Sequence, residues 1–550
     1  GPGARRWPAN MEAVERTGTV IVGAGVCGLK AASRLSLEGL RDFVLLDKQA
    51  AKGGIWTSMA NASSRVQISE PSYRLMADRP ATAYTPQGEL LEEMDELCRR
   101  DGIDGKLRFG CEVVSVRDCT EAQGVEVRYR DSGGAMRSIV AADHVLLCTG
   151  GLQQPREVAF AGEGDFRGHS ILGMRSEIDA TPLAGRHVLV LGMGAFAVEN
   201  ARTALLAGAG RVTIVARTIT AVVPRLGLFM SALAHGQSLL RAGGPAAGAA
   251  APAPSEKAQE DMKRQTMFLA LPYQLASAPH LMPAPMKAFL EGKPFVPPAN
   301  AKVTIPVCSD VFFLALKLGR LEVVLGEVES FQPDGVLVRE GAGAGKAGED
   351  AAGCRHIPCD VVVKCFGFEA PDPHLDAVVG CERIRSPLYI TEKVLLMKVE
   401  HNPQSFVAPG ALGLRDGVDI GGSATVVSDM YMETFLHFRA HPEELPAVLE
   451  RLPHPKIHED SYADFGAGLR ALLEVPALAE RAKAIRAKYA ANVRAKYPKG
   501  LLDFMRQNKA DWEDACAALA DGDRQAVPYF FDMMLQGLER TRKPAATARL

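Results

Sequence analysis

The chain has 550 residues, of which 47% are hydrophobic, and a chain of this length is expected to form several domains with more than one buried core. The formal net charge is −2, so there is no excess positive charge to attract nucleic acid or an anionic membrane surface. The 11 cysteines are scattered rather than grouped in a short framework, which favours a reducing, cytoplasmic compartment. These properties favour a small-molecule partner and exclude a nucleic-acid-binding role.

Residues 1–16 precede the first regular pattern, and we expect a tag or a disordered tail there. The stretch "GTVIVGAGVCGLKAA" (18–32) then indicates a buried strand, a glycine turn and a helix. In such a G-x-G-x-x-G turn the first glycine permits the tight turn, the second lets a pyrophosphate approach the backbone, and the third lets helix and strand pack closely. The whole turn is therefore a predicted dinucleotide site: Gly23, Ala24, Gly25, Val26, Cys27 and Gly28.

The next apolar run, "FVLLDK", ends in Asp47 and Lys48. An acidic residue about 20 residues after such a turn accepts hydrogen bonds from a ribose hydroxyl. Both residues are therefore assigned to the same nucleotide site. The motif alone leaves open whether that nucleotide is FAD or NAD.

A second strand, glycine turn and helix follow at "VLVLGMGAFAVENAR" (188–202), with Gly192, Gly194, Ala195 and Ala197 in the turn. The strand after it, "RVTIVAR", ends in Arg217 instead of an acid. Arginine at this place suits a 2′-phosphate, so the second nucleotide is predicted to be NADPH. An ordinary strand-end charge is the alternative for Arg217.

These patterns predict an α/β fold with two Rossmann-like dinucleotide-binding domains and a helical C-terminal region. The expected domain limits are 17–180 with 325–436, 181–324, and 437–550. An Ala/Gly/Pro-rich insertion at 241–300 is expected to be mobile. In the C-terminal region Leu478, Ala482 and Ile485 recur at helical spacing, which predicts a buried stripe beneath a solvated basic face. No stretch approaches 18 consecutive apolar residues, so no integral membrane segment is expected.

Five motifs in order resemble the flavin-containing monooxygenases, which are two-dinucleotide-binding-domain flavoproteins. They are the first turn with Asp47, "GGIW" (53–56), "LLCTGG" (146–151), the second turn with Arg217, and "DVVVKCFGF" (360–368). The resemblance implies FAD at the first turn, with Gly54, Ile55, Trp56 and Gly150 beside it, and NADPH at the second. It further implies reduction of FAD by NADPH, capture of O2 as a C4a-hydroperoxide, and oxygen transfer to a small nucleophilic N or S, or to a carbonyl.

The chain departs from the family pattern in three places. "FRGHSILG" shortens the family's hallmark motif and leaves His169 directly after Gly168, where a surface or capping role is the better interpretation. Ser69 falls where the family often has an Asn near the flavin, and it is the one candidate catalytic residue. Its hydroxyl can donate one hydrogen bond, and a turn-capping serine is the alternative. Cys148 and Cys365 replace the family's small residues and are expected to be buried packing cysteines.

Other function classes stay open at this point. A disulfide reductase needs a reactive cysteine pair beside the flavin, and Cys354 and Cys359 precede a strand instead. An NADPH oxidase that releases peroxide, or a non-catalytic redox sensor, would keep every nucleotide motif. No metal-binding residue is assigned, and a homo-oligomer is possible. The terminus Ala548-Arg549-Leu550 resembles a peroxisomal address, although chance is the better explanation in so Ala- and Arg-rich a tail.

Overall fold

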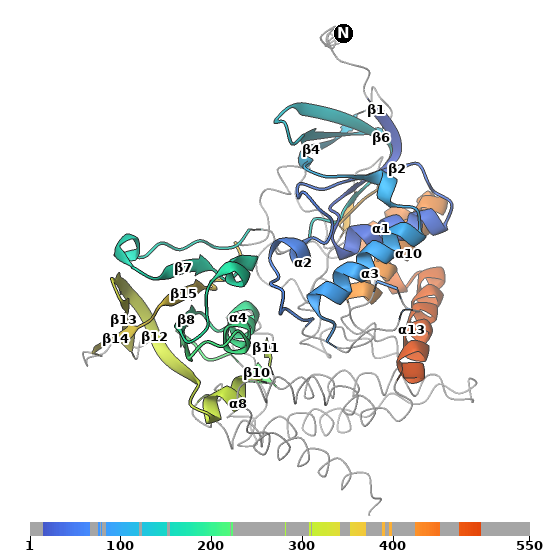
Figure 1. Ribbon diagram of the computed structural model, residues 1–550. Helices are drawn as coiled ribbons and strands as arrows, with labels where there is room; N and C mark the ends of the chain where they lie inside the picture. The colour runs from blue at the N-terminus through green and yellow to red at the C-terminus, as the bar shows by residue number, and fades with distance from the viewer. Residues whose placement is uncertain are drawn as a thin grey trace, which may run out of the picture.

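In the computed structural model the described residues form two α/β bodies, each built around its own sheet (Figure 1). Ser69, the 241–300 segment except for residue 281, and the C-terminal tripeptide lie outside the described residues. The described residues are 15–66, 75–76, 79, 84–119, 124–150, 154–220, 222–223, 281, 307–309, 311–340, 353–369, 388–390, 395–398, 424–451 and 472–496.

The first sheet has eight strands in the order β16-β17-β6-β1-β2-β3, and β4 and β5 extend it from β6 as an antiparallel pair. Strands β1, β2, β3, β6 and β17 run parallel, and the central ones are continuous apolar runs, as burial on both faces requires. The bounds are β1 Glu15–Val22, β2 Phe43–Leu46, β3 Leu107–Arg108, β4 Glu112–Cys119, β5 Gly124–Arg130, β6 Met136–Leu147, β16 Leu388–Ile390 and β17 Leu395–Lys398.

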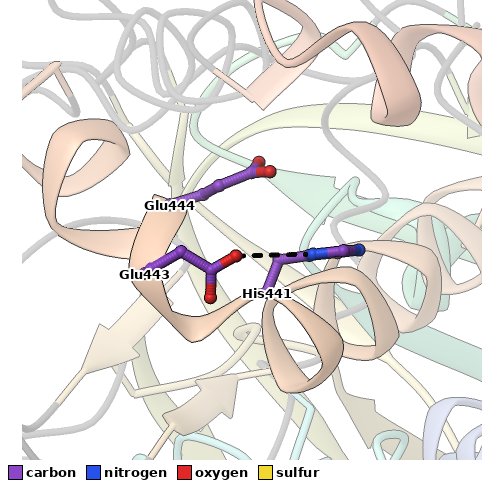
Figure 2. Close-up of side chains that lie close together, drawn as sticks. All are labelled: His441, Glu443 and Glu444. Atoms are coloured by element: carbon purple, nitrogen blue, oxygen red, sulfur yellow. Dashed lines mark ion pairs between the residues drawn. The ribbon is translucent and has the colours of Figure 1, made fainter.

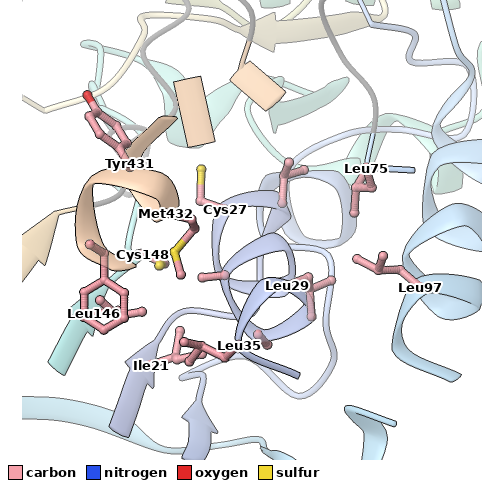
Figure 3. Packing of buried hydrophobic residues seen from close by; sticks show 14 of the residues in the cluster. Ile21, Cys27, Leu29, Leu35, Leu75, Leu97, Leu146, Cys148, Tyr431 and Met432 are labelled. Carbon is pink, nitrogen blue, oxygen red and sulfur yellow. The ribbon is translucent and has the colours of Figure 1, made fainter. Parts of the chain in front are cut away.

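Helices cover one face of the parallel part of this sheet. Side chains of β4 and β5, which join the sheet through β6, pack against the other face. Side chains from β1, β6, α1 and α10 meet in one apolar cluster (Figure 3), in which Ile21, Leu29 and Phe435 are fully buried. The helices that accompany this sheet are α1 Val26–Leu37, α2 Ile55–Ser58, α3 Gln87–Arg100, η1 Asp104–Lys106, α10 Ala424–Ala440, η6 Pro442–Glu444, α11 Leu445–Arg451 and α13 Pro476–Lys496.

The second sheet has seven strands in the order β14-β13-β12-β9-β8-β15-β7. Its parallel part, β7, β15, β8, β9 and the start of β12, packs against the Ala-rich helix α4 and against α8. The bounds are η2 Glu163–Asp165, β7 His169–Leu172, η3 Ser176–Ala180, β8 His187–Leu191, α4 Ala195–Leu206, β9 Arg211–Ala216, β10 Val222–Val223, β11 Val307–Cys308, α8 Val311–Lys317, β12 Leu321–Gln332, β13 Gly335–Glu340, β14 Cys354–Pro358 and β15 Val361–Lys364.

The strand pairing corrects the expected division of the chain. β7, at 169–172, and the stretch from β12 to β15, at 321–364, pair in the second sheet, although the sequence limits place most of both in the first domain. A buried parallel strand such as "VVVK" carries no mark of which sheet it joins, so its apolar sequence alone misplaced it. The return to the first sheet comes with β16, β17 and α10.

The two segments that connect the bodies lie side by side. Pro155 and Phe368 form an antiparallel bridge, and the Arg156 amide donates to the Gly367 carbonyl at 2.8 Å. The chain therefore crosses between the sheets twice at one place.

The C-terminal stripe is confirmed in α13 as far as its side chains are described. Leu478 and Ala482 are buried in the first core and Ile485 packs against it, while Arg481 and Lys483 are exposed. Helicity begins earlier than expected, because α10 starts at residue 424. Within the described ranges, every helix is too short or too polar to cross a bilayer.

Candidate functional site

The first glycine turn joins β1 to α1, and two of its glycines are dictated by packing. Gly23 has φ +106, and a Cβ there would lie 2.4 Å from the Cys148 carbonyl oxygen. A Cβ on Gly28 would lie 1.8 Å from the Gly23 carbonyl oxygen. Any side chain at either place would force the turn or the helix to move.

Gly25 differs from these two. It caps α1 with an ordinary φ of −80 and, as a glycine, gives the first turn of the helix no side-chain cap. A Cβ on Gly25 would meet only the backbone of Gly54, at 3.6 Å. Among the described residues, the space over Gly25 is thus left free, at the end of a helix whose dipole favours an anion.

The structure brings "GGIW" to this turn. Gly53 donates its amide to the Ala24 carbonyl at 2.9 Å, and Gly54 caps the short helix α2 with φ +57. Ile55 and Trp56 then form α2, with Trp56 buried in the first core. The segment is therefore fixed against the predicted nucleotide site.

Asp47 lies directly after β2 and faces the same turn. Its carboxylate accepts hydrogen bonds from the amides of Ala24, at 2.5 Å, and Gln49, at 2.7 Å. Burial raises the pKa of this carboxyl above its usual value, against the lowering effect of the two amides. The neighbouring Lys48 is exposed.

The two turns are built on one plan. The turn Cys148–Thr149–Gly150 follows β6 and packs against the first glycine turn, and Cys365–Phe366–Gly367 follows β15 and packs against the second. The Cys148 amide donates to the Val22 carbonyl at 2.7 Å, and the Cys365 amide donates to the Leu191 carbonyl at 2.9 Å. Both thiols are buried as expected, and burial raises their pKa values, that of Cys365 to about 12.

The second turn joins β8 to α4. Gly192 has φ +109, and a Cβ there would lie 2.4 Å from the Cys365 carbonyl oxygen. Gly194 caps α4, and no atom of a described residue lies within 4 Å of a Cβ built on it. Ala195 is exposed at the start of the helix, and Ala197 is fully buried against the sheet, where its methyl group fits.

Arg217 directly follows β9, the strand next to β8, so it lies at the same edge of the second sheet as the glycine turn. Its side chain is 76% exposed, and among the described residues it pairs with a Glu327 carboxylate oxygen 3.9 Å away. At that distance and exposure the ion pair is weak, and the guanidinium is available to a ligand.

Other candidates lie away from the two turns. His169 begins β7 in register with Val361, at the amino end of the parallel strands and opposite the glycine turn. Cys354 begins β14 and Cys359 directly follows its last residue, about 17 Å away along the extended chain, so they form no redox pair. Burial also raises the pKa of the Cys359 thiol to about 12.

The described residues also contain a group of metal-ligating side chains at the end of α10, His441, Glu443 and Glu444, whose ligand atoms lie within 4.8 Å of one another (Figure 2). His441 pairs with Glu443 at 3.5 Å, and the buried His437 contacts Glu444 at 2.8 Å. Each histidine thus already has a carboxylate partner at the end of the helix.

A family model described as pyridine nucleotide-disulphide oxidoreductase matches residues 17–237. This match spans both glycine turns. Within the same class of proteins, the curated relatives that match the chain include monooxygenases. A Baeyer-Villiger monooxygenase of Streptomyces coelicolor is 28% identical over 215 residues, which are 38% of this chain and 40% of that protein. The FAD-containing monooxygenase EthA of Mycobacterium tuberculosis is 27% identical over 216 residues, 38% of this chain and 43% of that protein. Over this region the chain is therefore similar both to pyridine nucleotide-disulphide oxidoreductases and to flavin-containing monooxygenases.

Solved structures of two monooxygenases share the fold. A steroid monooxygenase bound to NADP has a TM-score of 0.55 at 16% identity, over 85% of this chain and 98% of that one. Cyclohexanone monooxygenase in an open form has a TM-score of 0.53 at 16% identity, over 84% of this chain and 98% of that one. The sequence match to the curated flavin monooxygenases is shorter and spans less than half of their length.

Proposed function

We propose that the chain is an NADPH- and FAD-dependent monooxygenase. The observation that supports this most is the pair of glycine turns, each with a free space over its second glycine at a helix N-terminus. The first turn would hold the FAD pyrophosphate, with Asp47 near the ribose and Gly54 against the same space. The second would hold NADPH, with Arg217 toward the 2′-phosphate.

The bound flavin would supply acceptance of a hydride and reaction with O2. The protein's part is to bind and orient the two nucleotides and to exclude water from the place where they meet. A disulfide reductase would instead need a low-pKa thiol at the flavin. The segment 48–66 contains no cysteine, and burial raises the pKa values of Cys148 and Cys365, which lie beside the turns.

For the substrate we propose a small organic molecule, a ketone first and a nucleophilic nitrogen or sulfur compound second. The sequence motifs alone favoured the second class. The names of the matched proteins favour the first, because they include a Baeyer-Villiger monooxygenase and enzymes named for polycyclic ketones and cyclohexanone. Soluble cyclic ketones, thioethers and tertiary amines are the corresponding probes.

The test is an NADPH oxidation assay with product analysis. A monooxygenase should oxidise NADPH in step with formation of a lactone, sulfoxide or N-oxide, and substrate should suppress release of hydrogen peroxide. Peroxide equal to the NADPH oxidised, with every probe unchanged, would instead identify an oxidase. A flavin that NADPH does not reduce would contradict the proposal and leave the redox-sensor alternative.

A further inference from the structure

Helix α4 buries polar side chains on the face that points away from its own sheet. Glu199, Arg202 and Thr203 lie three and four residues apart, so they share one face of the helix, and they are only 7%, 8% and 5% exposed. The other face, with Val198, Ala201 and Leu205, packs into the second core. Charged side chains are seldom buried unless a partner is present, so something outside the second domain covers this face.

The cover is a loop of the first domain, residues 61–64, which follows α2. Arg202 donates from Nη1 to the Ser63 carbonyl at 3.0 Å and also pairs with Glu199 at 3.2 Å. The Thr203 hydroxyl donates to the Asn61 side-chain oxygen at 3.3 Å. A second contact joins the same loop to the second domain, where the Asp179 carboxylate accepts from the Ala62 amide at 2.9 Å. We call these six residues the interdomain latch: Asn61, Ser63, Asp179, Glu199, Arg202 and Thr203.

The loop is firmly attached on its own side. The Asn61 side-chain oxygen also accepts from the Ser63 amide at 3.0 Å, and the Ser64 carbonyl accepts from the Gln87 amide at 2.9 Å. The Gln87 side-chain amide donates to the carbonyls of Trp56, at 2.7 Å, and Ala60, at 3.2 Å. The loop is thus held to the "GGIW" segment that borders the first glycine turn.

Helix α4 provides the connection on the other side. Arg202 lies eight residues after Gly194, about 12 Å along the same rigid helix that caps the second turn. Each domain has its own core, so their mutual orientation depends on contacts between them. Hydride transfer requires the reacting atoms to lie within about 3–3.5 Å, and small misplacements slow it strongly.

We propose that the interdomain latch orients the second nucleotide site against the first, with Arg202 and Asn61 as positioning residues for hydride transfer. This inference rests on the proposed function. Because the contacts are polar and join one loop to the face of α4 and to η3, they can hold the domains in one orientation without fusing the two cores. The latch contacts described above involve neither glycine turn, so we expect nucleotide affinity to be independent of them.

The test compares Arg202→Ala, Arg202→Lys and Asn61→Ala with Arg211→Ala, an arginine that pairs with Glu322 inside the second sheet. Anaerobic stopped-flow absorbance measures flavin reduction at saturating NADPH and the Kd for NADPH. We expect both alanine variants of the latch to lower the reduction rate at least about tenfold with little change in Kd. Arg202→Lys should recover part of the rate, and Arg211→Ala should match the wild type.

Hydrogen exchange gives a second readout that needs no turnover. Arg202→Ala should speed amide exchange in the peptide that covers residues 61–64, while peptides from β1 and α1 exchange as in the wild type. Because Arg202→Ala leaves Glu199 buried, the double variant Arg202→Ala/Glu199→Ala keeps the test valid if the single variant unfolds.

Two outcomes separate this inference from the proposed function. A wild-type flavin that NADPH does not reduce would overturn both. A second outcome would overturn the latch alone. In it, NADPH reduces the wild-type flavin, and the folded latch variants either show the same reduction rate or differ only in a higher Kd for NADPH.

Discussion

The glycines of the two turns serve two different purposes, and the structure separates them residue by residue. Gly23, Gly28 and Gly192 are required by the fold, because a Cβ on any of them would lie within 2.4 Å of a carbonyl oxygen. Gly25 and Gly194 have room for a side chain as far as the described residues show. Only the second kind of glycine reports on a ligand.

Gly25→Val should therefore fold and lose its flavin. The branched side chain would occupy the space over the helix N-terminus where the pyrophosphate is predicted to lie. We expect circular dichroism like the wild type and flavin absorbance reduced at least about tenfold, since a displaced phosphate loses several charge-assisted contacts. Gly88→Ala, with nothing within 4 Å of its Cβ, is the matched control. If the Gly25→Val protein kept its yellow flavin absorbance, the assignment of FAD to the first turn would be wrong.

Arg217→Ala tests the choice of NADPH at the second turn. Loss of a charge-assisted contact to phosphate costs about 1.5–3 kcal/mol, so the KM for NADPH should rise about ten- to a hundredfold. The KM for NADH should barely change, because NADH lacks the 2′-phosphate. Steady-state assays with both nucleotides measure this difference, and Arg211→Ala serves as the control. If the KM values for NADPH and NADH rose equally, Arg217 would be an ordinary surface charge with no role in binding the 2′-phosphate.

At the scale of elements, the contact of β6 with α10 gives a pH dependence. His144 on β6 packs edge-on against Phe435 of α10, with ring centroids 4.9 Å apart. Burial lowers the pKa of His144 to about 4, with Arg439 acting in the same direction and Asp143 against it. The folded state therefore binds this proton less well than the unfolded state, so the stabilisation is complete above about pH 6.5 and is lost as the pH falls toward 4.

His144→Leu should flatten that dependence. Between pH 7.5 and pH 5, the wild type should lose about 2 kcal/mol more unfolding free energy than the variant, as follows from the two pKa values of the histidine. Urea unfolding at both pH values measures the difference. Parallel losses in the two proteins would mean that His144 is as easily protonated in the folded state as in the unfolded one.

The elements at the turns could be predicted from sequence because each is a local pattern. An apolar run, glycines at fixed spacing and a helical run placed β1, α1, β8 and α4 correctly. The packing role of Cys148 was also predictable. The latch was not, because Asn61 and Thr203 are 142 positions apart and each is an ordinary polar residue in its own segment. A polar face on a helix predicts solvent, and only the tertiary contact shows that this one is buried.

At the scale of the whole molecule, the first domain is built from both ends of the described chain. β17 completes the sheet beside β6, and α10 packs on α1, about 400 residues away in sequence. The second domain is inserted between these two parts. Sequence patterns showed that such a return exists, but they could not assign β15 or β7 to a sheet, because strand pairing at long separation leaves no local signal.

The ion pair between Lys30 of α1 and Asp429 of α10 tests whether those two ends share one cooperative core. The Lys30 ammonium lies 2.8 Å from the Asp429 carboxylate, and the two side chains are 7% and 28% exposed. Lys30→Ala should cost about 1–3 kcal/mol, less than a fully buried pair, because Asp429 keeps some water. A double-mutant cycle with Asp429→Ala isolates the coupling energy, which should exceed the near-zero coupling of the exposed pair Lys483–Glu480.

Destabilisation by Lys30→Ala should also lower the temperature at which the flavin is released, as measured by its fluorescence, since the first nucleotide site lies at the N-terminus of α1. A cycle with no coupling, or flavin release that stays at the wild-type temperature while α10 unfolds, would show that the C-terminal return is not needed to hold that site together.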